Sequence, residues 1–355
     1  MHTVGLMTTQ GSGALSEEPG CPDTRQQARS DALGLSETPY WAKFGMGSAA
    51  IWRMSIYNYS ITNDGAALPL VSVVIPHCNS LATLKNCVSL LDRQTFCRDR
   101  FEIIVADNNS SCGMDAVREA VPAARVIHAD EQGAGPARNA GVGASKGSIL
   151  AFIDSDCLPD LDWIEKGVAG IQAYDFIGGR VIVTSEDPLR PNPIEAFEMV
   201  FAFDFERYIN RVGFTGTGNM FVWRKVFDVV GAFRNGLAED MDWSFRARAQ
   251  SFRLGYVEDL IVEHPARKTW SELMARWKRM VLEEYLLYQE RPFFIVNWLL
   301  HKSLMPLSIL PHACHILMSS RLINFGSRWG ALKVLARLRL WRTWEMFSLL
   351  VRNSP

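Results

Sequence analysis

The sequence lacks the cysteine patterns of metal and redox sites. It contains seven cysteines in 355 residues, but no CxxC pair and no cysteine–histidine spacing typical of zinc. Several of these cysteines lie in apolar stretches, where a thiol acts as a small hydrophobic group. We therefore expect them to be reduced and mainly structural, as in a cytosolic protein.

An excess of charge of either sign is also absent. The chain has 37 Lys and Arg residues against 38 Asp and Glu residues, which gives a net charge of -1. Such a chain has no global field to hold a polyanion, so we expect no nucleic-acid partner. With 48% hydrophobic residues, the chain is long enough to bury a large core, which excludes a short peptide module or a disordered scaffold.

The first 50 residues have no basic start followed by an apolar stretch, so they predict neither a signal peptide nor a membrane helix. Their mixture of Gly, Ser, Thr, Glu and Arg predicts a disordered extension over residues 1–68. Met54 stands shortly before the first strand pattern, which suggests a natural start near this residue. Peptides from residues 1–50 in the mass spectrum of the native protein would contradict that hypothesis.

From residue 70 onward, short apolar runs alternate with helical patterns, which predicts a parallel sheet built from βαβ units. Asn79 or Ser80 can cap the first helix, and Thr269 and Glu272 form a capping box that begins a later one. The expected strands are residues 71–75, 101–106, 125–128, 148–153 and 176–184.

Carboxylates follow two of the expected strands directly. Asp107 ends the second strand, and Asp154 and Asp156 follow the fourth with one residue between them. The carboxyl ends of parallel strands share one rim of a sheet, where ligands bind in open α/β folds. The two carboxylates of the Asp-Ser-Asp motif are expected to share Mg²⁺ or Mn²⁺, although turn formation is the alternative role for each of these residues. Cys157 is assigned to packing because a soft thiolate suits zinc or copper.

A glycine-rich turn at residues 133–139 is expected to begin a helix. It differs from a dinucleotide fingerprint because it follows the third strand and has Arg138 in place of the last glycine, so a nicotinamide site is disfavoured. Arg138 near a helix start is expected to face a phosphate. An ordinary surface arginine is the alternative.

Three further groups complete the candidate site. Gly218 is expected to let the backbone approach a sugar, with Asn219 donating a hydrogen bond; a flexible turn is the alternative. Glu239 and Asp240 are neighbouring carboxylates whose repulsion raises a pKa, with helix capping as the alternative. His264 is a candidate metal ligand or phosphate donor, and a structural histidine is equally expected.

Together, these motifs occur in the order and approximate spacing of family 2 glycosyltransferases, which the chain resembles from about residue 70 to about residue 267. The positions that carry the resemblance are Pro76, Asp107, the segment 133–141, Asp154-Ser-Asp156, Gly216-Thr-Gly-Asn219 and Glu239-Asp240.

The resemblance implies a GT-A fold, in which a Rossmann-like, mostly parallel α/β sheet is flanked by helices. It implies that Asp107 contacts the nucleotide base, that Asp156 holds the cation on the diphosphate and that Asp240 is the general base. Ala106-Asp107-Asn-Asn replaces the commoner Asp-Asp-Gly-Ser of that family. The residues expected to bind the donor are Pro76, Asp107, Arg138, Asp154, Gly218 and Asn219, and the expected metal ligands are Asp154, Asp156 and His264.

The implied activity is an inverting, metal-dependent transfer of a sugar from a nucleotide-sugar donor to a saccharide or lipid-linked acceptor. This chemistry needs a cation to neutralise the leaving diphosphate and a base to deprotonate the incoming hydroxyl. Two alternatives are a nucleotidyltransferase, which is disfavoured because no basic Gly-rich loop follows the first strand, and a non-catalytic protein that binds sugar-nucleotides. The presence of both Asp156 and Asp240 argues against the second alternative.

The chain after the expected catalytic domain (69–268) differs in composition. The apolar segment 293–318 is interrupted by His301, Lys302, Pro306 and Pro311, so a simple membrane-spanning helix is not expected. Residues 321–352 contain six Arg and Lys333 against one acid, Glu345, interleaved with tryptophan and leucine.

This second pattern predicts an in-plane membrane helix; the alternative is a helix packed on the catalytic domain. We therefore expect residues 269–355 to be helical and to attach a cytoplasmic enzyme to the cytosolic face of the membrane.

Overall fold

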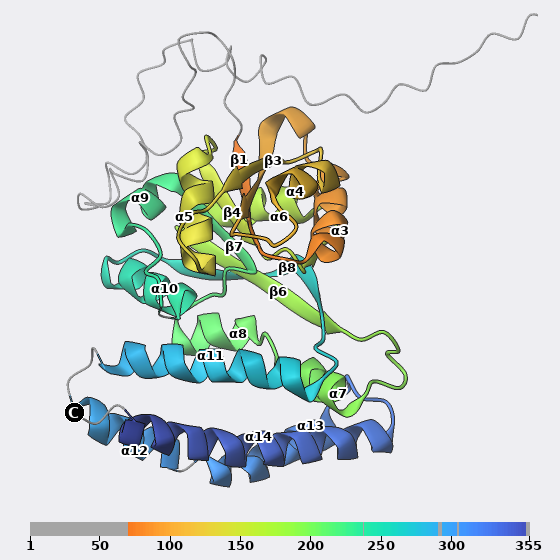
Figure 1. The fold of residues 1–355 in the computed structure, drawn as a ribbon, viewed down its shortest axis with the longest axis vertical. Coiled ribbons are helices and arrows are strands. Elements are labelled where there is room, and N and C mark those ends of the chain that lie inside the picture. Colours follow the sequence, from red (N-terminus) through yellow and green to blue (C-terminus); the bar gives the residue numbers. More distant parts are fainter. Residues whose placement is uncertain (1–69, 237, 290–292, 304, 353–355) are drawn as a thin grey trace, which may run out of the picture. The chain divides into compact units, whose positions relative to one another are not determined.

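A mixed sheet of eight strands forms the centre of the fold (Figure 1). The computed structural model describes residues 70–352 except 237, 290–292 and 304, and it leaves out the side chains of 297 and 300–303; the predicted extension and Met54 lie outside these residues. The strands are β1 (Val71–His77), β2 (Phe101–Asp107), β3 (Arg125–His128), β4 (Ile149–Ile153), β5 (Leu158–Pro159), β6 (Phe176–Thr184), β7 (Asn219–Trp223) and β8 (Leu254–Pro265).

The strand order is β3-β2-β1-β4-β7-β6-β8-β5. The first four strands in this order are parallel, and β7 pairs antiparallel with both β4 and β6. β6 and β8 are parallel, and β5 pairs antiparallel with β8. In this register His77 lies opposite Asp107, and Asp107 opposite His128, so the carboxyl ends of β1, β2 and β3 form one rim.

Helices cover both faces of the sheet. On one face, Gly141 of α5 packs on β1 so closely that an added Cβ would lie 2.4 Å from Val74 Cγ1. On the other face, Trp163 of α6 contacts the ring of Phe221 at 4.6 Å. The helices between the strands are α3 (Leu81–Asp92), α4 (Met114–Ala120), α5 (Ala134–Ala144), α6 (Trp163–Gly170), α7 (Pro193–Phe201), α8 (Phe205–Arg207), α9 (Arg224–Val230) and α10 (Glu239–Ala249).

Short helical turns complete these connections. They are η3 (Arg98–Arg100), η4 (Ile171–Ala173) and η5 (Tyr208–Val212).

Four helices follow β8: α11 (Trp270–Gln289), α12 (Phe294–Ser303), α13 (Ile309–Met318) and α14 (Phe325–Arg352), with the turn η6 (Pro306–Ser308) before α13. α14 packs along α7, and a shared hydrophobic cluster contains Ile194, Leu273, Ile316 and Leu335. Because this cluster joins α7 to α11, α13 and α14, the C-terminal helices are built into the same core as the segment before them. None of the helices in the described part of the chain combines the length and apolar character needed to cross a membrane.

Most of the expected elements are present with small differences at their ends. β6 has the predicted bounds, and α11 begins with the predicted capping box, in which Glu272 N donates to Thr269 Oγ1 at 3.2 Å and Thr269 N to Glu272 Oε2 at 3.4 Å. The cysteine prediction is wrong at Cys97, which is disulfide-bonded. The free cysteines of the described chain are Cys78, Cys87, Cys112, Cys157 and Cys314.

Candidate active site

The ends of β1 and β2 are joined by a buried hydrogen-bond network around Asp107. His77 Nδ1 donates to Asp107 Oδ1 at 2.9 Å, because the carboxylate can only accept, and His77 Nε2 accepts from Ser80 N at 3.2 Å. Ser110 donates its hydroxyl to the same oxygen at 2.5 Å and its backbone N–H to Oδ2 at 3.2 Å. Burial alone would raise the pKa of Asp107, but the bonds from Ser110 and His77 outweigh it and lower the pKa. Pro76 precedes this network, opposite Ala106.

Asn108 ties the neighbouring loops together. Its amide donates to the carbonyls of Ala129 at 2.9 Å and Glu131 at 2.7 Å, and its oxygen accepts from Gly133 N at 2.8 Å. The glycine at the corresponding position of Asp-Asp-Gly-Ser has no side chain to make these hydrogen bonds. The departure from Asp-Asp-Gly-Ser therefore has a structural consequence: an amide at position 108 fixes the glycine-rich turn against the rim.

Arg138, at the start of α5, is buried with 4% of its surface exposed and bridges two carboxylates. Its Nη2 donates to Asp154 Oδ1 at 2.6 Å and its Nη1 to Glu239 Oε1 at 2.9 Å. In the structure both terminal nitrogens of Arg138 bind carboxylates, and a contact of Arg138 with a phosphate stays a prediction. Arg138 therefore connects the rim of the sheet to α10.

Glu239 and Asp240 occupy the first turn of α10. Asp240 is half-buried, and its Oδ1 accepts from Met241 N at 2.7 Å. Burial, followed by the negative charge of Glu239, raises the pKa of Asp240 to about 6. Asp242 has a different role, since it is buried between Arg234 and Arg246 and holds the helix in place. Only the first two carboxylates are therefore free to face a substrate.

A third carboxylate faces this pair from α11. Glu283 has 21% of its side chain exposed and lies 3.6 Å from Arg279. Burial and the charge of Glu239 raise its pKa to about 7, while Arg279 opposes the shift. The sequence analysis did not select Glu283, because an isolated glutamate in an amphipathic helix carries no motif.

Asp156, in the turn between β4 and β5, lies close to His264 of β8, the strand with which β5 pairs. His264 Nε2 lies 3.3 Å from Asp156 Oδ2, and His264 Nδ1 lies 2.7 Å from the carbonyl of Pro265. Because a carbonyl only accepts, Nδ1 carries a hydrogen, which leaves Nε2 facing the carboxylate, where it donates when the ring is protonated or can bind a cation when it is not. Burial would raise the pKa of Asp156, but the hydrogen bond and charge of His264, with Arg267, lower it.

These residues fit a divalent cation. A metal-bound histidine typically donates its other N–H to a carbonyl, as His264 does. A cation between His264 Nε2 and Asp156 Oδ2 would accept a lone pair from each atom. Cys157 Sγ lies within 4.8 Å of the same atoms. Burial, followed by the charge of Asp154, raises the pKa of the Cys157 thiol well above its usual value, so it stays protonated and ligates weakly. The hard oxygen of Asp156 with an imidazole suits Mn²⁺ or Mg²⁺.

Asp154, the third predicted metal ligand, is not part of this group. Its Oδ1 binds Arg138, and its Oδ2 lies against Gly218, where an added Cβ would be 3.0 Å away. The structure therefore separates the two carboxylates of the Asp-Ser-Asp motif, because Asp154 turns toward α5 and Asp156 toward β8. The lack of a side chain at Gly218 permits this close approach, and the expected approach of its backbone to a sugar stays a prediction.

Asn219 does not have the predicted free side chain. It is completely buried at the start of β7, its amide donates to the carbonyls of Arg180 at 3.0 Å and Leu260 at 2.9 Å, and its oxygen accepts from Trp163 Nε1 at 2.9 Å. These carbonyls lie where the β6–β8 register shifts, between Gly179 and Arg180. Donation to a sugar is therefore excluded, because the amide hydrogens satisfy a bulge.

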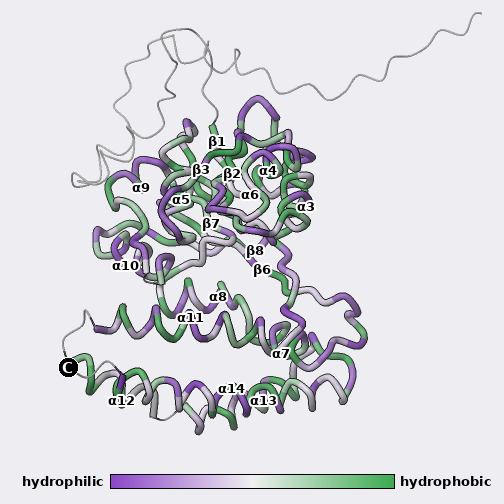
Figure 2. The backbone as a smooth tube through the Cα atoms, viewed as in Figure 1, coloured by the Kyte–Doolittle hydropathy of each residue, from purple (hydrophilic) through white to green (hydrophobic). Residues whose placement is uncertain are grey.

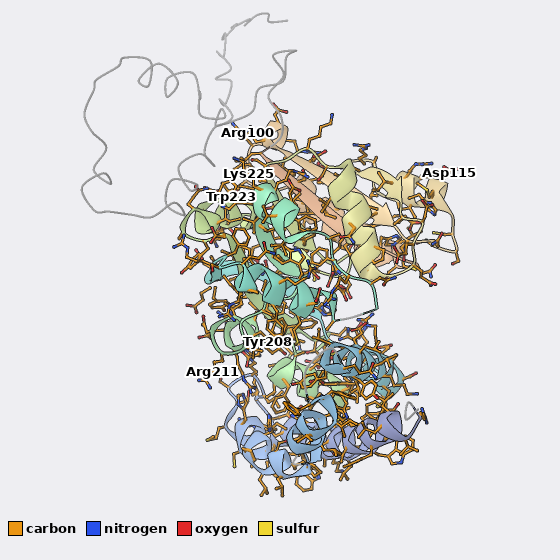
Figure 3. All side chains as sticks on the ribbon, turned by 90° about the vertical axis from the view of Figure 1, so that its left-hand side faces the viewer. Arg100, Asp115, Tyr208, Arg211, Trp223 and Lys225 are labelled. Atoms are coloured by element: carbon orange, nitrogen blue, oxygen red, sulfur yellow. The ribbon has the colours of Figure 1, made fainter. Side chains whose placement is uncertain are left out.

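Phe203 lies between His264, a candidate metal ligand, and Arg276 of α11. Its ring lies 4.5 Å from that of His264 and 4.4 Å from the guanidinium carbon of Arg276, and its φ of +57° is unusual for a side chain of this size. Tyr208 follows on the same segment, between the strands and the C-terminal helices (Figure 3), and stacks on Phe214 at 5.0 Å. The sequence offered no signal for Phe203 or Arg276 beyond an aromatic-rich segment.

Comparisons with known proteins agree with this architecture. Residues 72–231 match the sequence profile of Glycosyl transferase family 2. Glycosyltransferase AglE of Haloferax volcanii is 32% identical over 224 residues, which cover 61% of this chain and 73% of AglE. A PGL/p-HBAD biosynthesis glycosyltransferase of Mycobacterium bovis is 29% identical over 194 residues, covering 52% of this chain and 71% of that protein.

Among solved structures, the mannosyltransferase PcManGT of Pyrobaculum calidifontis, in complex with GDP-Man and Mn²⁺, superposes with a TM-score of 0.50. The match covers 88% of this chain and 94% of PcManGT at 16% identity. The fold is therefore that of the GT-A glycosyltransferases. The chain belongs to glycosyltransferase family 2, which confirms the resemblance found in its motifs.

Proposed function

We propose that this glycosyltransferase moves a sugar from a nucleotide-sugar donor to a hydroxyl of a saccharide or lipid-linked acceptor, with inversion at the anomeric carbon. The observation that carries the proposal is the bridge made by Arg138 between Asp154, on the donor rim, and Glu239, beside Asp240. The buried guanidinium of Arg138 thereby fixes the position of Asp154, on the donor side, relative to Glu239, on the base side. Such positioning is a large part of catalysis in group transfer.

Asp240 is the proposed general base. In this mechanism its carboxylate takes the proton of the acceptor hydroxyl while the oxygen forms a bond to the anomeric carbon and the nucleoside diphosphate leaves with the electron pair of the broken bond. A pKa of about 6 makes Asp240 a stronger base than an ordinary aspartate and still leaves it ionised near neutral pH. Glu239 supports this state through its negative charge, and Arg138 limits the shift.

On the donor side, Asp156 and His264 are the proposed ligands of Mg²⁺ or Mn²⁺. When bound there, the cation would neutralise charge on the leaving diphosphate. Support comes from the 3.3 Å approach of His264 Nε2 to Asp156 Oδ2 and from the contact of His264 Nδ1 with the Pro265 carbonyl, which leaves Nε2 as the ring nitrogen that faces the site. Asp107, held by His77 and Ser110 at the neighbouring strand end, is the proposed residue for recognition of the nucleotide base, with Pro76 beside it.

We place the reaction in polysaccharide or glycoconjugate biosynthesis, at the cytosolic face of the membrane. The printed name of the Mycobacterium bovis relative, a biosynthesis glycosyltransferase, supports the first part. The basic and aromatic composition of residues 321–352 supports the second part. A lipid-linked acceptor would be presented to the enzyme at such a surface.

A panel of UDP-, GDP- and dTDP-sugars tests the proposal. Each is incubated with the full chain and Mn²⁺, and the release of nucleoside diphosphate and the shift in melting temperature are measured, because a ligand that binds the folded state stabilises it. We expect one class of donor to be protective and to be hydrolysed slowly. Consumption of pyrophosphate would instead indicate nucleotidyl transfer, and protection without turnover under any acceptor would indicate a binding protein.

A further inference from the structure

The exposed hydrophobic side chains of this protein are concentrated in its last four helices. Of the 21 large hydrophobic side chains that are exposed in the described residues, 15 follow residue 290. They lie on α12, η6, α13 and α14 and on the turns between them, where Figure 2 shows hydrophobic stretches. Single exposed hydrophobic residues are ordinary, but such a concentration indicates a partner surface.

α14 carries this surface most clearly. Its buried residues face α7, α11 and α13, as expected for an amphipathic helix packed on a core. The opposite side of the helix is apolar as well, and we call it the outer stripe. Its members recur at intervals of three, four or eleven residues: Phe325, Trp329, Leu340, Trp344, Phe347 and Val351.

The outer stripe is strongly exposed. Trp329 has 54% of its surface exposed, Leu340 has 60% and Trp344 has 59%. Lys333 and Arg337 fill the interval in the middle of the stripe at the same helical spacing. A helix that only packs on its own domain would carry polar residues on this side. The alternative considered from the sequence, a helix packed on the catalytic domain, therefore accounts for the inner side of α14 alone.

The charges next to the stripe are positive. Several arginines of this region are used inside the protein, since Arg328 binds the carbonyls of Leu317 and Leu322, and Arg342 lies over the ring of Trp277. Lys333, Arg337 and Arg352 have exposed side chains beside the stripe, although Arg337 also lies over the ring of Trp270 at 4.0 Å and Arg352 lies 4.0 Å from the region's one acid, Glu345, which is mostly covered. The surface is therefore apolar with a basic border.

Its length and composition define the partner. A helix of 28 residues at about 1.5 Å per residue extends for about 42 Å, but α14 is too rich in charge to cross a bilayer. Tryptophan rings at the headgroup level and basic side chains toward anionic phosphates are typical of a helix that lies in the membrane plane. A second protein would not require basic residues along the centre of the stripe.

We propose that the outer stripe of α14, together with exposed Leu307, Leu310 and Met318 of η6 and α13, docks on a bilayer that contains anionic lipid. α14 lies parallel to the membrane, with Trp329 and Trp344 inserted among the headgroups. Trp341 of the same helix is partly buried against the core cluster and does not belong to the outer stripe. The inference deepens the proposed membrane placement and does not depend on the sugar chemistry.

Trp341 and Trp344 provide a matched test on one helix. The full chain is mixed with vesicles of phosphatidylcholine and phosphatidylglycerol in which part of the lipid carries bromine, which quenches nearby tryptophan emission. Trp344→Phe should remove a measurable share of the quenched emission, whereas Trp341→Phe should leave the quenching unchanged. Equal losses from both variants, or quenching that neither variant alters, would overturn the proposal.

Co-sedimentation measures the contribution of the stripe to binding. Trp329→Glu with Trp344→Glu should weaken binding to the anionic vesicles at least tenfold, whereas Val229→Glu, which changes an equally exposed residue on α9, should have no effect. Binding should also weaken from 0.1 to about 0.5 M salt, because surface charge is screened over a short distance. Equal sedimentation of all variants contradicts the proposal.

Two further outcomes separate this inference from others. If the chain without vesicles is a dimer in light scattering, and Trp329→Glu with Trp344→Glu makes it a monomer without changing vesicle binding, the stripe binds a second copy and the proposal is wrong. Vesicle binding by a chain that hydrolyses no sugar-nucleotide would contradict the proposed function and leave this inference standing. Donor hydrolysis without vesicle binding would do the reverse.

Discussion

The proposed metal side of the site, with Asp156 and His264, and the proposed base side, with Asp240 and Glu239, each contain an aspartate, but the pKa values of the two aspartates are shifted in opposite directions. The carboxyl of Asp156 has a lowered pKa, whereas that of Asp240 has a pKa raised to about 6. Burial favours the neutral form in both. The difference comes from the neighbours, since Asp156 faces His264 and Arg267, and Asp240 faces Glu239.

This contrast supports the proposed division of roles between the two aspartates. A carboxylate that stays ionised can hold a cation, while one whose pKa lies close to neutral pH can accept and release a proton. Arg138 is the residue that touches both sides, through Asp154 and Glu239. The site therefore works as two electrostatic environments joined by one guanidinium, and the experiments below test each environment and the connection between them.

The largest effect is expected on the metal side. Asp156→Ala should abolish transfer, with a loss of more than about a thousandfold, because the leaving diphosphate is then uncompensated. Activity should depend on added Mn²⁺ or Mg²⁺ and disappear in EDTA. Circular dichroism should show an unchanged fold, since Asp156 lies at the surface of the rim. Full turnover in EDTA would remove the metal from the mechanism.

On the base side, Asp240→Asn should lower kcat by about a hundredfold, which is the usual scale for loss of a general base. Donor affinity should change little, because Asp240 is not on the donor side of the site. Glu239→Gln is the matched variant and should cost less, since Glu239 acts on Asp240 through its charge and its bond to Arg138. Normal turnover in Asp240→Asn with a defect in Glu239→Gln would exchange their roles.

The connection between the two sides is tested by pH profiles. The base must be ionised, so kcat/KM should fall about tenfold per pH unit below the pKa of Asp240, near 6. The positive charge of Arg138 lowers that pKa, so Arg138→Met should raise it and move the acidic limb to higher pH. Arg138→Lys keeps the charge and should keep the limb in place, although one ammonium group cannot bridge Asp154 and Glu239 as a guanidinium does.

If Arg138→Met loses activity while the fall of kcat/KM at low pH stays in place, then Arg138 has only a structural role. Arg138→Lys is the control for misfolding, because Arg138→Met removes one partner of a buried ion pair, which costs about 3–5 kcal/mol of folding stability. A folded Lys variant with a displaced limb would equally contradict the assignment, since its charge is unchanged.

Much of the fold could be predicted because its sequence patterns involve residues that lie close together along the chain. Short apolar runs identified β1, β2, β4 and β6, and the carboxylates that follow β2 and β4 identified the rim. The capping box at Thr269 identified the start of α11 for the same reason, because its two hydrogen bonds link residues three apart. Family membership then followed from the order of motifs along the chain.

Side-chain direction and long-range contact could not be predicted in this way. Nothing in the sequence around Asn219 shows that a bulge between β6 and β8, about 40 residues away on each side, takes both amide hydrogens. The separation of Asp154 from Asp156 depends on Arg138 and His264, which belong to distant elements.

Glu283 provides the smallest and most specific test of the contrast. Its pKa of about 7 lies well above the ordinary value of 4.5, because it is buried near Glu239. Below pH 4.5 both the folded and the unfolded states hold the proton. Between these values the unfolded state loses it first, so the contribution of Glu283 to stability decreases as pH rises, and above pH 7 the folded state bears the full penalty, on the order of 1–3 kcal/mol.

Glu283→Gln removes this titration. Its melting temperature should therefore exceed that of the natural chain by a few degrees at pH 8 and equal it at pH 4, as measured by calorimetry. Glu284→Gln is the matched control on the same helix, and it should lower the melting temperature at pH 8, because Glu284 lies 3.7 Å from buried Arg342. If Glu283→Gln changes the melting temperature by the same amount at pH 4 and at pH 8, then the charge of Glu239 does not oppose that of Glu283. The base side of the site would then include α10 but not α11.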